Sequence, residues 1–263
     1  MKLVDIGANL SHESFSHDLE AVIASARAAG LAHIIVTGTD KQSNEAALQL
    51  SKENPEIFSC SAGFHPHVAD SVDEQALDSV RKLVKLEQVV AVGETGLDFN
   101  RNFSSRDSQL RVFEQHLQLA AEIGKPLFLH QRDAHPEFVT LLGRYRDQIV
   151  GGVVHCFTDN RKALEDYLAL DMYIGITGWI CDERRGIELQ KLLSLIPADR
   201  LLLETDAPYL LPRTLSPRPK TRRNEPKYLL EVLKTVAACS GRSCEQIAQQ
   251  TSENAVRLFK LAV

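Results

Sequence analysis

The chain has 263 residues, of which 44% are apolar and 25% are charged, and these proportions exclude wholesale disorder. The net charge of −5 argues against a protein that coats duplex DNA through a broad basic surface. It does not exclude a nuclease, because a bound metal ion and a few local arginines are enough to hold phosphate.

Short apolar runs alternate with longer amphipathic segments along the whole chain. Each apolar run has the length of a buried parallel strand. The predicted strands, in chain order, cover residues 3–6, 32–36, 57–62, 89–92, 126–129, 152–154, 172–176 and 201–203. The predicted helices cover residues 18–30, 42–52, 73–86, 105–124, 135–147, 161–169, 183–195, 226–240 and 244–258. Eight alternations without a linker predict a single α/β domain over residues 1–263, folded as a closed (β/α)8 barrel of the TIM type.

The alternative architecture is an open doubly wound sheet, but the sequence shows no glycine-rich dinucleotide fingerprint to support it. The five cysteines are scattered without CxxC spacing, which predicts free thiols in a reducing cytoplasm. No apolar run has the length of a signal peptide or a membrane span. We therefore expect a cytoplasmic protein with no membrane partner, and its size and negative charge favour a monomer.

Ionisable side chains follow most of the predicted strands at their carboxyl ends. In a β/α barrel these ends face one mouth, where the active site lies. The residues are Asp5 and Asn9 after the first strand, His65 after the third, Glu94 and Asp98 after the fourth, His130 and Arg132 after the fifth, His155 after the sixth, and Glu204 and Asp206 after the eighth. We therefore expect imidazoles and carboxylates from distant parts of the sequence to converge.

Imidazoles and carboxylates without cysteine suit a borderline or hard divalent ion such as Zn²⁺, Mn²⁺ or Mg²⁺. Such an ion lowers the pKa of a bound water, and a nearby carboxylate can accept the proton. Each histidine alone is more simply explained as a hydrogen-bonded cap, so the prediction depends on their combination. His67, His116 and His135 are expected to be structural residues, and Cys156 a small buried one.

Six segments in order along the chain strengthen this interpretation: GFHPH at 63–67, GETGLDF at 93–99, HQRDA at 130–134, HCF at 155–157, ETDAPYL at 204–210 and RNEP at 223–226. Together they resemble the TatD family of metal-dependent deoxyribonucleases, one of the amidohydrolase-like barrels, over essentially the whole chain. The resemblance implies a metal-dependent phosphodiesterase, a 3′→5′ exonuclease on single-stranded DNA and RNA with a part in DNA repair.

The resemblance also implies four metal ligands, namely Glu94, His130, His155 and Asp206. Asp206 would in addition deprotonate the water that attacks phosphorus, and Glu204 would support it. His65 would lie close to the scissile phosphate. Independently of the resemblance, we expect Arg132 and the loop bearing Arg222 and Arg223 to bind neighbouring phosphates bidentately. An equal alternative for Arg222 and Arg223 is a solvated charge run.

One position departs from the family pattern. Many relatives carry His-x-His after the first-strand aspartate, and this chain has Gly7 and Asn9 there. Glycine offers no ligand atom, and an asparagine amide is a weaker donor to a transition metal. We therefore expect one tightly held ion, most simply Mg²⁺, with a second ion weak or absent.

A single-stranded substrate needs aromatic surfaces for its bases. The candidates on predicted mouth loops are Phe64, Phe99, Phe103, Trp179 and Tyr209, of which Trp179 is preferred. Two other functions stay open. One is an amidase, lactonase or aminoacyl-tRNA deacylase on the same metal site, because a barrel and a metal do not choose the substrate. The other is a non-catalytic metal-binding adaptor, which the full set of four predicted ligands disfavours.

Overall fold

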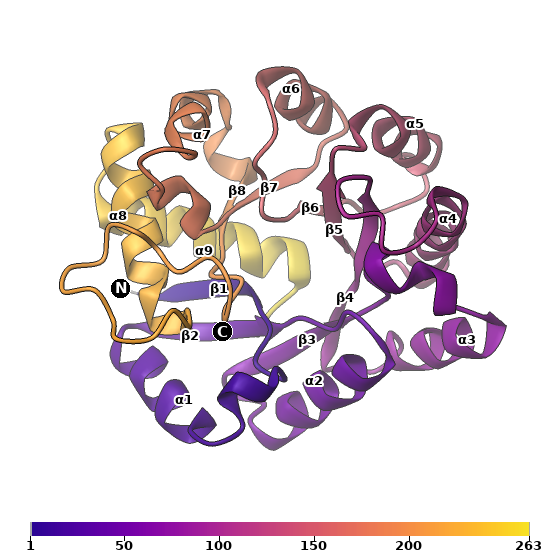
Figure 1. Cartoon of the computed structure of the whole chain (residues 1–263), viewed down its shortest axis with the longest axis horizontal. Helices are drawn as coiled ribbons and strands as arrows, with labels where there is room; N and C mark the ends of the chain where they lie inside the picture. The colour runs from indigo at the N-terminus through magenta and orange to yellow at the C-terminus, as the bar shows by residue number, and fades with distance from the viewer. Residues whose placement is uncertain (1, 263) are drawn as a thin grey trace. The chain divides into compact units, whose positions relative to one another are not determined.

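The computed structural model describes residues 2–262 and contains one eight-stranded parallel sheet in which the strands follow sequence order (Figure 1). The strands are β1 (Leu3–Ala8), β2 (Leu31–Val36), β3 (Phe58–Ala62), β4 (Val89–Asp98), β5 (Leu127–Arg132), β6 (Gly152–Val154), β7 (Tyr173–Ile176) and β8 (Leu201–Leu203). This order, with a helix after each strand, is that of a (β/α)8 barrel, and the predicted fold class is confirmed.

The helices lie close to their predicted positions. They are α1 (Leu19–Ala28), α2 (Lys41–Glu53), α3 (Glu74–Leu83), α4 (Arg106–Ile123), α5 (His135–Tyr145), α6 (Arg161–Ala169), α7 (Ile187–Leu192), α8 (Leu229–Ser240) and α9 (Cys244–Phe259). Side-chain caps set several starts, as where Ser243 accepts from the amide of Gln246 at the start of α9. α7 begins four residues later than predicted, because the Asp182 carboxylate binds the amides of Arg184 and Arg185 and holds that segment in a turn. α8 begins three residues late, because Pro226–Tyr228 form a 3-10 turn.

Strand β4 runs six residues beyond its predicted end, through a segment with two glycines. Gly93 and Gly96 have φ of 138° and 144°, which side-chain-bearing residues rarely adopt. A Cβ on Gly96 would lie 1.9 Å from the carbonyl oxygen of His130. This close approach lets β4 pair with β5 as far as Asp98 opposite Arg132, with Gly96 opposite His130.

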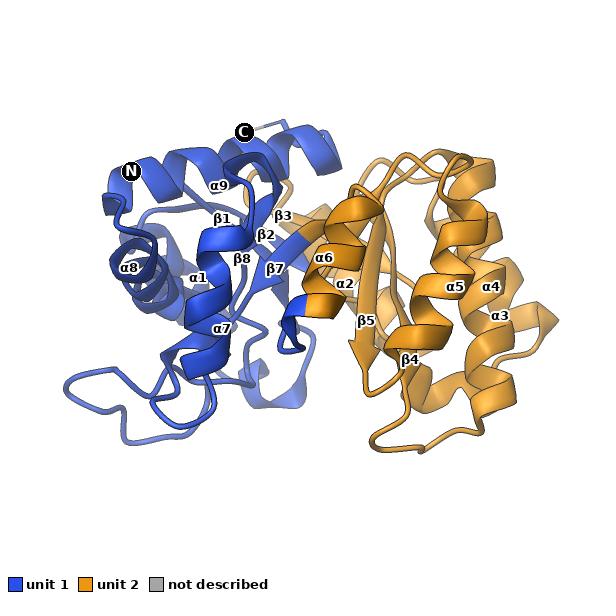
Figure 2. Cartoon of the chain, turned by 90° about the horizontal axis from the view of Figure 1, so that it is seen from above, with its two compact units in different colours: residues 1–36, 156–161, 174–263 blue, residues 37–155, 162–173 orange. Residues whose placement is uncertain are grey.

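The chain separates into two compact units (Figure 2). Unit 1 comprises residues 1–36, 156–161 and 174–263, and unit 2 comprises residues 37–155 and 162–173. In unit 2, the buried rings of Phe113 on α4 and Phe138 on α5 stack with 5.0 Å between their centroids. The expectation that residues 1–263 form one domain stays a prediction.

Within the part of the chain that the structure describes, no helix combines the length and hydrophobicity that a membrane crossing requires. All five cysteines are free thiols, as their spacing predicts.

Candidate metal centre and active site

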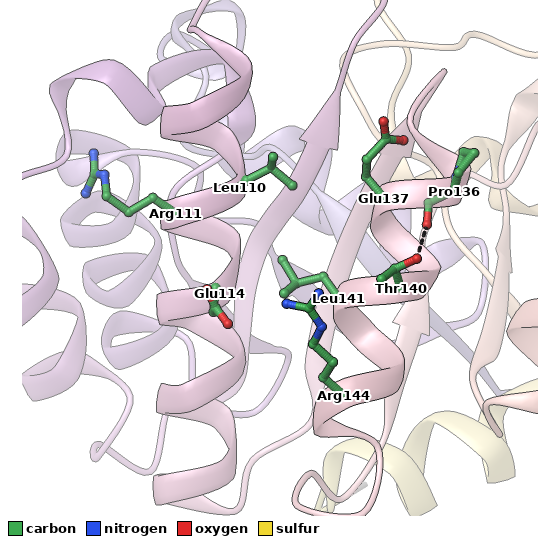
Figure 3. A pocket seen from close by; sticks show the side chains of 8 residues that line it. All are labelled: Leu110, Arg111, Glu114, Pro136, Glu137, Thr140, Leu141 and Arg144. Carbon is green, nitrogen blue, oxygen red and sulfur yellow. Dashed lines mark hydrogen bonds between the residues drawn. The ribbon is translucent and has the colours of Figure 1, made fainter.

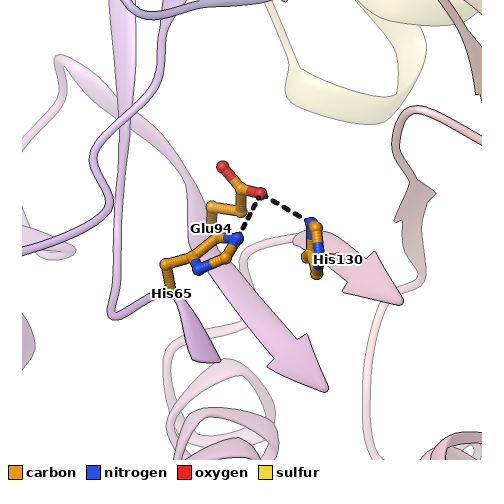
Figure 4. Close-up of side chains that lie close together, drawn as sticks. All are labelled: His65, Glu94 and His130. Carbon is orange, nitrogen blue, oxygen red and sulfur yellow. Dashed lines mark ion pairs between the residues drawn. The ribbon is translucent and has the colours of Figure 1, made fainter. Parts of the chain in front are cut away.

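Glu94, on β4 in unit 2, faces the rings of His65 and His130 (Figure 4). Its Oε1 lies 2.8 Å from Nε2 of His155, 3.1 Å from Nδ1 of His130 and 3.4 Å from Nε2 of His65. The side chain is buried, which alone would raise its pKa, but the neighbouring histidines hold the pKa of Glu94 well below its usual range. Glu94 is therefore an ionised carboxylate inside the protein, and it needs positive charge beside it.

His130 lies between two carboxylates. Its Nδ1 faces Glu94, and its Nε2 lies 3.5 Å from Oδ2 of Asp98. Burial alone would lower the pKa of His130, but hydrogen bonds to Asp98 and Glu94 raise it. Both interactions favour the protonated ring. A metal cation beside Glu94 would take the place of the proton on Nδ1 and leave the other hydrogen on Nε2, facing Asp98.

The donor set therefore fits a divalent ion. One carboxylate and two imidazoles, Glu94 with His130 and His155, are a common protein ligand set for a catalytic ion. Nδ1 of His130 and Nε2 of His155 lie 3.4 Å apart, on the same side of the carboxylate. Ligand atoms of His65, Glu94 and His130 also lie within 4.8 Å of one another.

His65 has the geometry of a hydrogen-bond donor. Its Nδ1 accepts from the backbone amide of His67 at 3.1 Å. The pKa of His65 is lowered to about 3, mainly by burial and to a smaller extent by the nearby His130. The ring is therefore neutral and carries one N–H. Because Nδ1 accepts, that hydrogen lies on Nε2, which points at Glu94. His65 thus presents an N–H to the site, while its own lone pair is already used.

Asp98 and His67 belong to the same cluster, although neither was predicted as a functional residue. Oδ2 of Asp98 accepts from Nε2 of His67 at 2.7 Å, and Oδ1 accepts from the amides of Asn100 and Arg101. Hydrogen bonds from both histidines outweigh burial and lower the pKa of Asp98 far below its usual value. The signal was present in the sequence, because residues four apart in a strand share one face and Asp98 follows Glu94 by four.

His116 is structural, as expected, but it supports the site. Its ring is fully buried in α4, Nδ1 donates to the Val112 carbonyl at 2.8 Å, and Nε2 accepts from the Phe64 amide at 3.1 Å. Burial lowers the pKa of His116 to about 4, which keeps the ring neutral. This pair of bonds anchors the segment that carries His65.

Asp206, predicted as a metal ligand and proton acceptor, lies in unit 1 beside Gly7 and Asn9. Its amide donates to the Gly7 carbonyl at 2.8 Å, and its Oδ1 accepts from Nδ2 of Asn9 at 3.0 Å. Asn9 therefore orients the Asp206 carboxylate by hydrogen bonding. The predicted roles of Asp206 as ligand and proton acceptor stay predictions.

Two further carboxylates of unit 1 are fully buried. Glu204 accepts from the amide of Cys156, the residue that follows His155 in the chain. Asp5 accepts from the amide and hydroxyl of Thr205, and burial raises the pKa of Asp5 to about 7. The expectation that Cys156 is buried is wrong: it is partly exposed at φ 46°, because this left-handed turn directs its amide to Glu204.

The two predicted phosphate-binding arginines differ in their surroundings. Arg132 is exposed at the end of β5. Arg223 already makes a bidentate ion pair with Asp18, at 2.8 and 2.7 Å, and a third contact with Glu225 at 3.0 Å. These bonds raise the pKa of Arg223 and anchor the loop after β8 to the start of α1. Phosphate binding by either arginine stays a prediction.

The five candidate aromatic residues differ in how exposed their side chains are. Phe64 and Phe99 are buried, and the guanidinium of Arg185 lies 4.3 Å from the ring centre of the partly buried Trp179. Phe103 and Tyr209 are exposed. A base has easier access to these two rings than to Trp179.

A groove of about 490 Å³ lies elsewhere in unit 2, between α4 and α5 (Figure 3). It is lined by Leu110, Arg111, Glu114, Pro136, Glu137, Thr140, Leu141 and Arg144. None of these residues contributes to the Glu94 cluster, so the groove is separate from the chemistry described above.

Comparison with known proteins decides the family. The sequence profile described as TatD related DNase matches residues 4–260. The chain belongs to the TatD family. A relative from Pectobacterium parmentieri (strain WPP163), named 3′-5′ ssDNA/RNA exonuclease TatD, is 48% identical over 260 residues, which cover 99% of this chain and all of the relative.

Solved structures of TatD proteins have the same fold. A TatD family hydrolase from Entamoeba histolytica is 25% identical with a TM-score of 0.89, covering 98% of this chain and 97% of its own. The TatD homolog YJJV from Escherichia coli k12 is 26% identical with a TM-score of 0.88, covering 98% of both chains. The resemblance seen in the sequence is thus confirmed at the level of the family.

Proposed function

We propose that this TatD chain is a metal-dependent 3′–5′ exonuclease that acts on single-stranded DNA and RNA. The observation that carries the proposal is the ionised, buried Glu94 with the ring nitrogens of His130 and His155 beside one of its oxygens. The activity named for a relative that is 48% identical over nearly the whole chain supports the choice of substrate.

In this proposal Glu94, His130, His155 and Asp206 hold the ion. The ion, when bound, lowers the pKa of a water and offsets the negative charge that develops on the phosphate. Mg²⁺ is the proposed ion, with Mn²⁺ or Zn²⁺ as alternatives, because Gly7 and Asn9 supply no imidazole and leave oxygen-rich ligation.

The chain's own residues perform the remaining steps. His65 donates its Nε2 hydrogen to a non-bridging phosphate oxygen, which orients the phosphate and stabilises its charge. Asp206 accepts the proton of the attacking water, and Asn9 fixes the direction of its carboxylate through Oδ1. Glu204 accepts from the amide of Cys156, and its support of Asp206 stays part of the proposal.

The remaining parts of the proposal concern the protein as a whole. Five free thiols support a reducing, cytoplasmic location. We further propose that the chain acts as a monomer and as a single hydrolase domain, and that it serves in DNA repair.

The test is hydrolysis of single-stranded DNA and RNA, labelled at either end, with Mg²⁺, Mn²⁺, Zn²⁺ or a chelator. We expect stepwise loss of nucleotides from the 3′ end that stops in chelator. Rapid loss of a 3′ label and a ladder from a 5′ label establish the direction. If no metal supports cleavage of either nucleic acid, the proposal fails, and esters and amides become the substrates to examine on the same site.

A further inference from the structure

Phe103 is exposed to an unusual degree for a large apolar residue. Its side chain is 65% exposed, more than any other large hydrophobic side chain in residues 2–262. A phenyl ring in water forgoes the stabilisation that burial gives, so an exposed one is informative when it lies beside a site.

The ring stands next to the Glu94 cluster. Phe103 meets His67 edge to face at 4.8 Å between ring centroids, and His67 meets His65 in the same way at 4.1 Å. The two histidines in turn contact Asp98 and Glu94. Two aromatic contacts therefore link Phe103 to His65, which in turn contacts Glu94, the carboxylate proposed to hold the metal.

The loop that carries the ring is fixed by hydrogen bonds on both sides. Asn102, at φ 50°, donates its side-chain amide to the Phe99 carbonyl at 2.6 Å. Ser104 donates its hydroxyl to the carbonyl of His67 at 2.9 Å. The backbone on both sides of Phe103 is thus held before any ligand arrives, and a preorganised loop loses little entropy on binding.

We propose that Phe103 is the stacking surface for a base of the substrate, on one of the two nucleotides that flank the scissile phosphate. This inference rests on the proposed exonuclease function. Every base has a π face, so stacking on one phenyl ring binds single strands without sequence preference. A base on Phe103 leaves its backbone beside His67 and His65, where the N–H of His65 is presented.

The test compares wild type with Phe103→Leu and Phe103→Trp on single-stranded DNA. One oligonucleotide carries natural bases throughout. Three others each carry a single abasic site, at the 3′-terminal nucleotide, at the nucleotide next to it, or far from the 3′ end. For wild type, an abasic site at one of the two terminal positions should raise KM by about five- to a hundredfold, and the distant site should have no effect.

Phe103→Leu should raise KM for the natural strand by a similar factor, with little change in kcat. It should also lose the discrimination against the abasic strand, and Phe103→Trp should keep it. Bound metal should be unchanged in both variants, since the ring touches no proposed ligand of the ion. Retained discrimination in Phe103→Leu overturns the proposal.

Failure of the nuclease proposal is separable from failure of this one. If wild type cleaves none of the strands, the same oligonucleotides are measured for binding in chelator by fluorescence anisotropy. Weaker binding of the terminal abasic strand by wild type, absent in Phe103→Leu, supports the stacking surface. Equal binding of all strands by both proteins overturns it.

Discussion

Asp98 and Glu94 lie on one face of β4 and share the ring of His130 between them. Carboxylates behind metal-binding histidines fix the tautomer and the orientation of the ring. Because Asp98 also holds His67 and two backbone amides, it fixes both the cluster and the loop that leads to Phe103. The chemistry at this scale depends on one buried carboxylate that is not itself a proposed ligand.

Replacing Asp98 by Asn should weaken metal binding by roughly ten- to a hundredfold, because an amide cannot accept from both histidines as an ionised carboxylate does. Calorimetric titration of the metal-free protein with Mg²⁺ measures the change in metal affinity. Asp147→Asn, an exposed substitution of the same kind in unit 2, is the control and should leave affinity unchanged. Equal affinities in the two variants would show that Asp98 does not position His130.

Asp5 predicts a pH dependence of stability. Burial raises its pKa to about 7 from 3.8, so the folded protein binds this proton more tightly than the unfolded chain does. The resulting stabilisation is fully present below pH 3.8 and is lost as pH rises to about 7, which corresponds to roughly 4 kcal/mol.

Asp5→Asn mimics the protonated acid and should raise Tm at pH 8 more than at pH 5. Thermal unfolding of the metal-free protein at the two pH values checks this. An equal change in Tm at pH 5 and pH 8 would contradict a buried carboxyl with a raised pKa at this position.

At the scale of elements, hydrophobic patterning predicts most of the structure. Strands and helices agree with the sequence because buried runs and capping residues act locally. The end of β4 could not be predicted, because the approach of Gly96 to the carbonyl of His130 appears only when β4 and β5 pair. The proposed ligands follow from their places at strand ends, whereas His67 was missed because its partner Asp98 lies 31 residues away.

Gly96→Ala tests the importance of this close approach. A Cβ at 1.9 Å from a carbonyl oxygen, at φ 144°, should cost about 3 kcal/mol or more in unfolding free energy and should displace Glu94 or His130. Gly124→Ala at the end of α4 is the matched control, since φ is 69° there and no atom lies within 4 Å of its Cβ. We expect it to cost only about 1 kcal/mol in denaturant unfolding. Similar costs for both variants would contradict the account of β4.

At the scale of the whole molecule, membership of the TatD family goes with the (β/α)8 fold. Gly7 and Asn9 stand where many relatives are expected to carry histidines, and Asn9 here binds Asp206. Within unit 2 the Glu94 cluster brings together His65, Glu94, His130 and His155, and so three of the four proposed ligands of the ion. The proposed activity therefore depends on that cluster and needs no ligand from Gly7.

The most direct test of this claim compares Glu94→Gln with Glu137→Gln, an exposed substitution of the same kind on α5. Metal content and cleavage of 3′-labelled single-stranded DNA are measured on the same samples. We predict that Glu94→Gln folds but loses both bound metal and at least about a thousandfold in rate, since charge at a catalytic ion is worth several kcal/mol. Glu137→Gln should match wild type in both. Cleavage at the wild-type rate by Glu94→Gln would contradict the account.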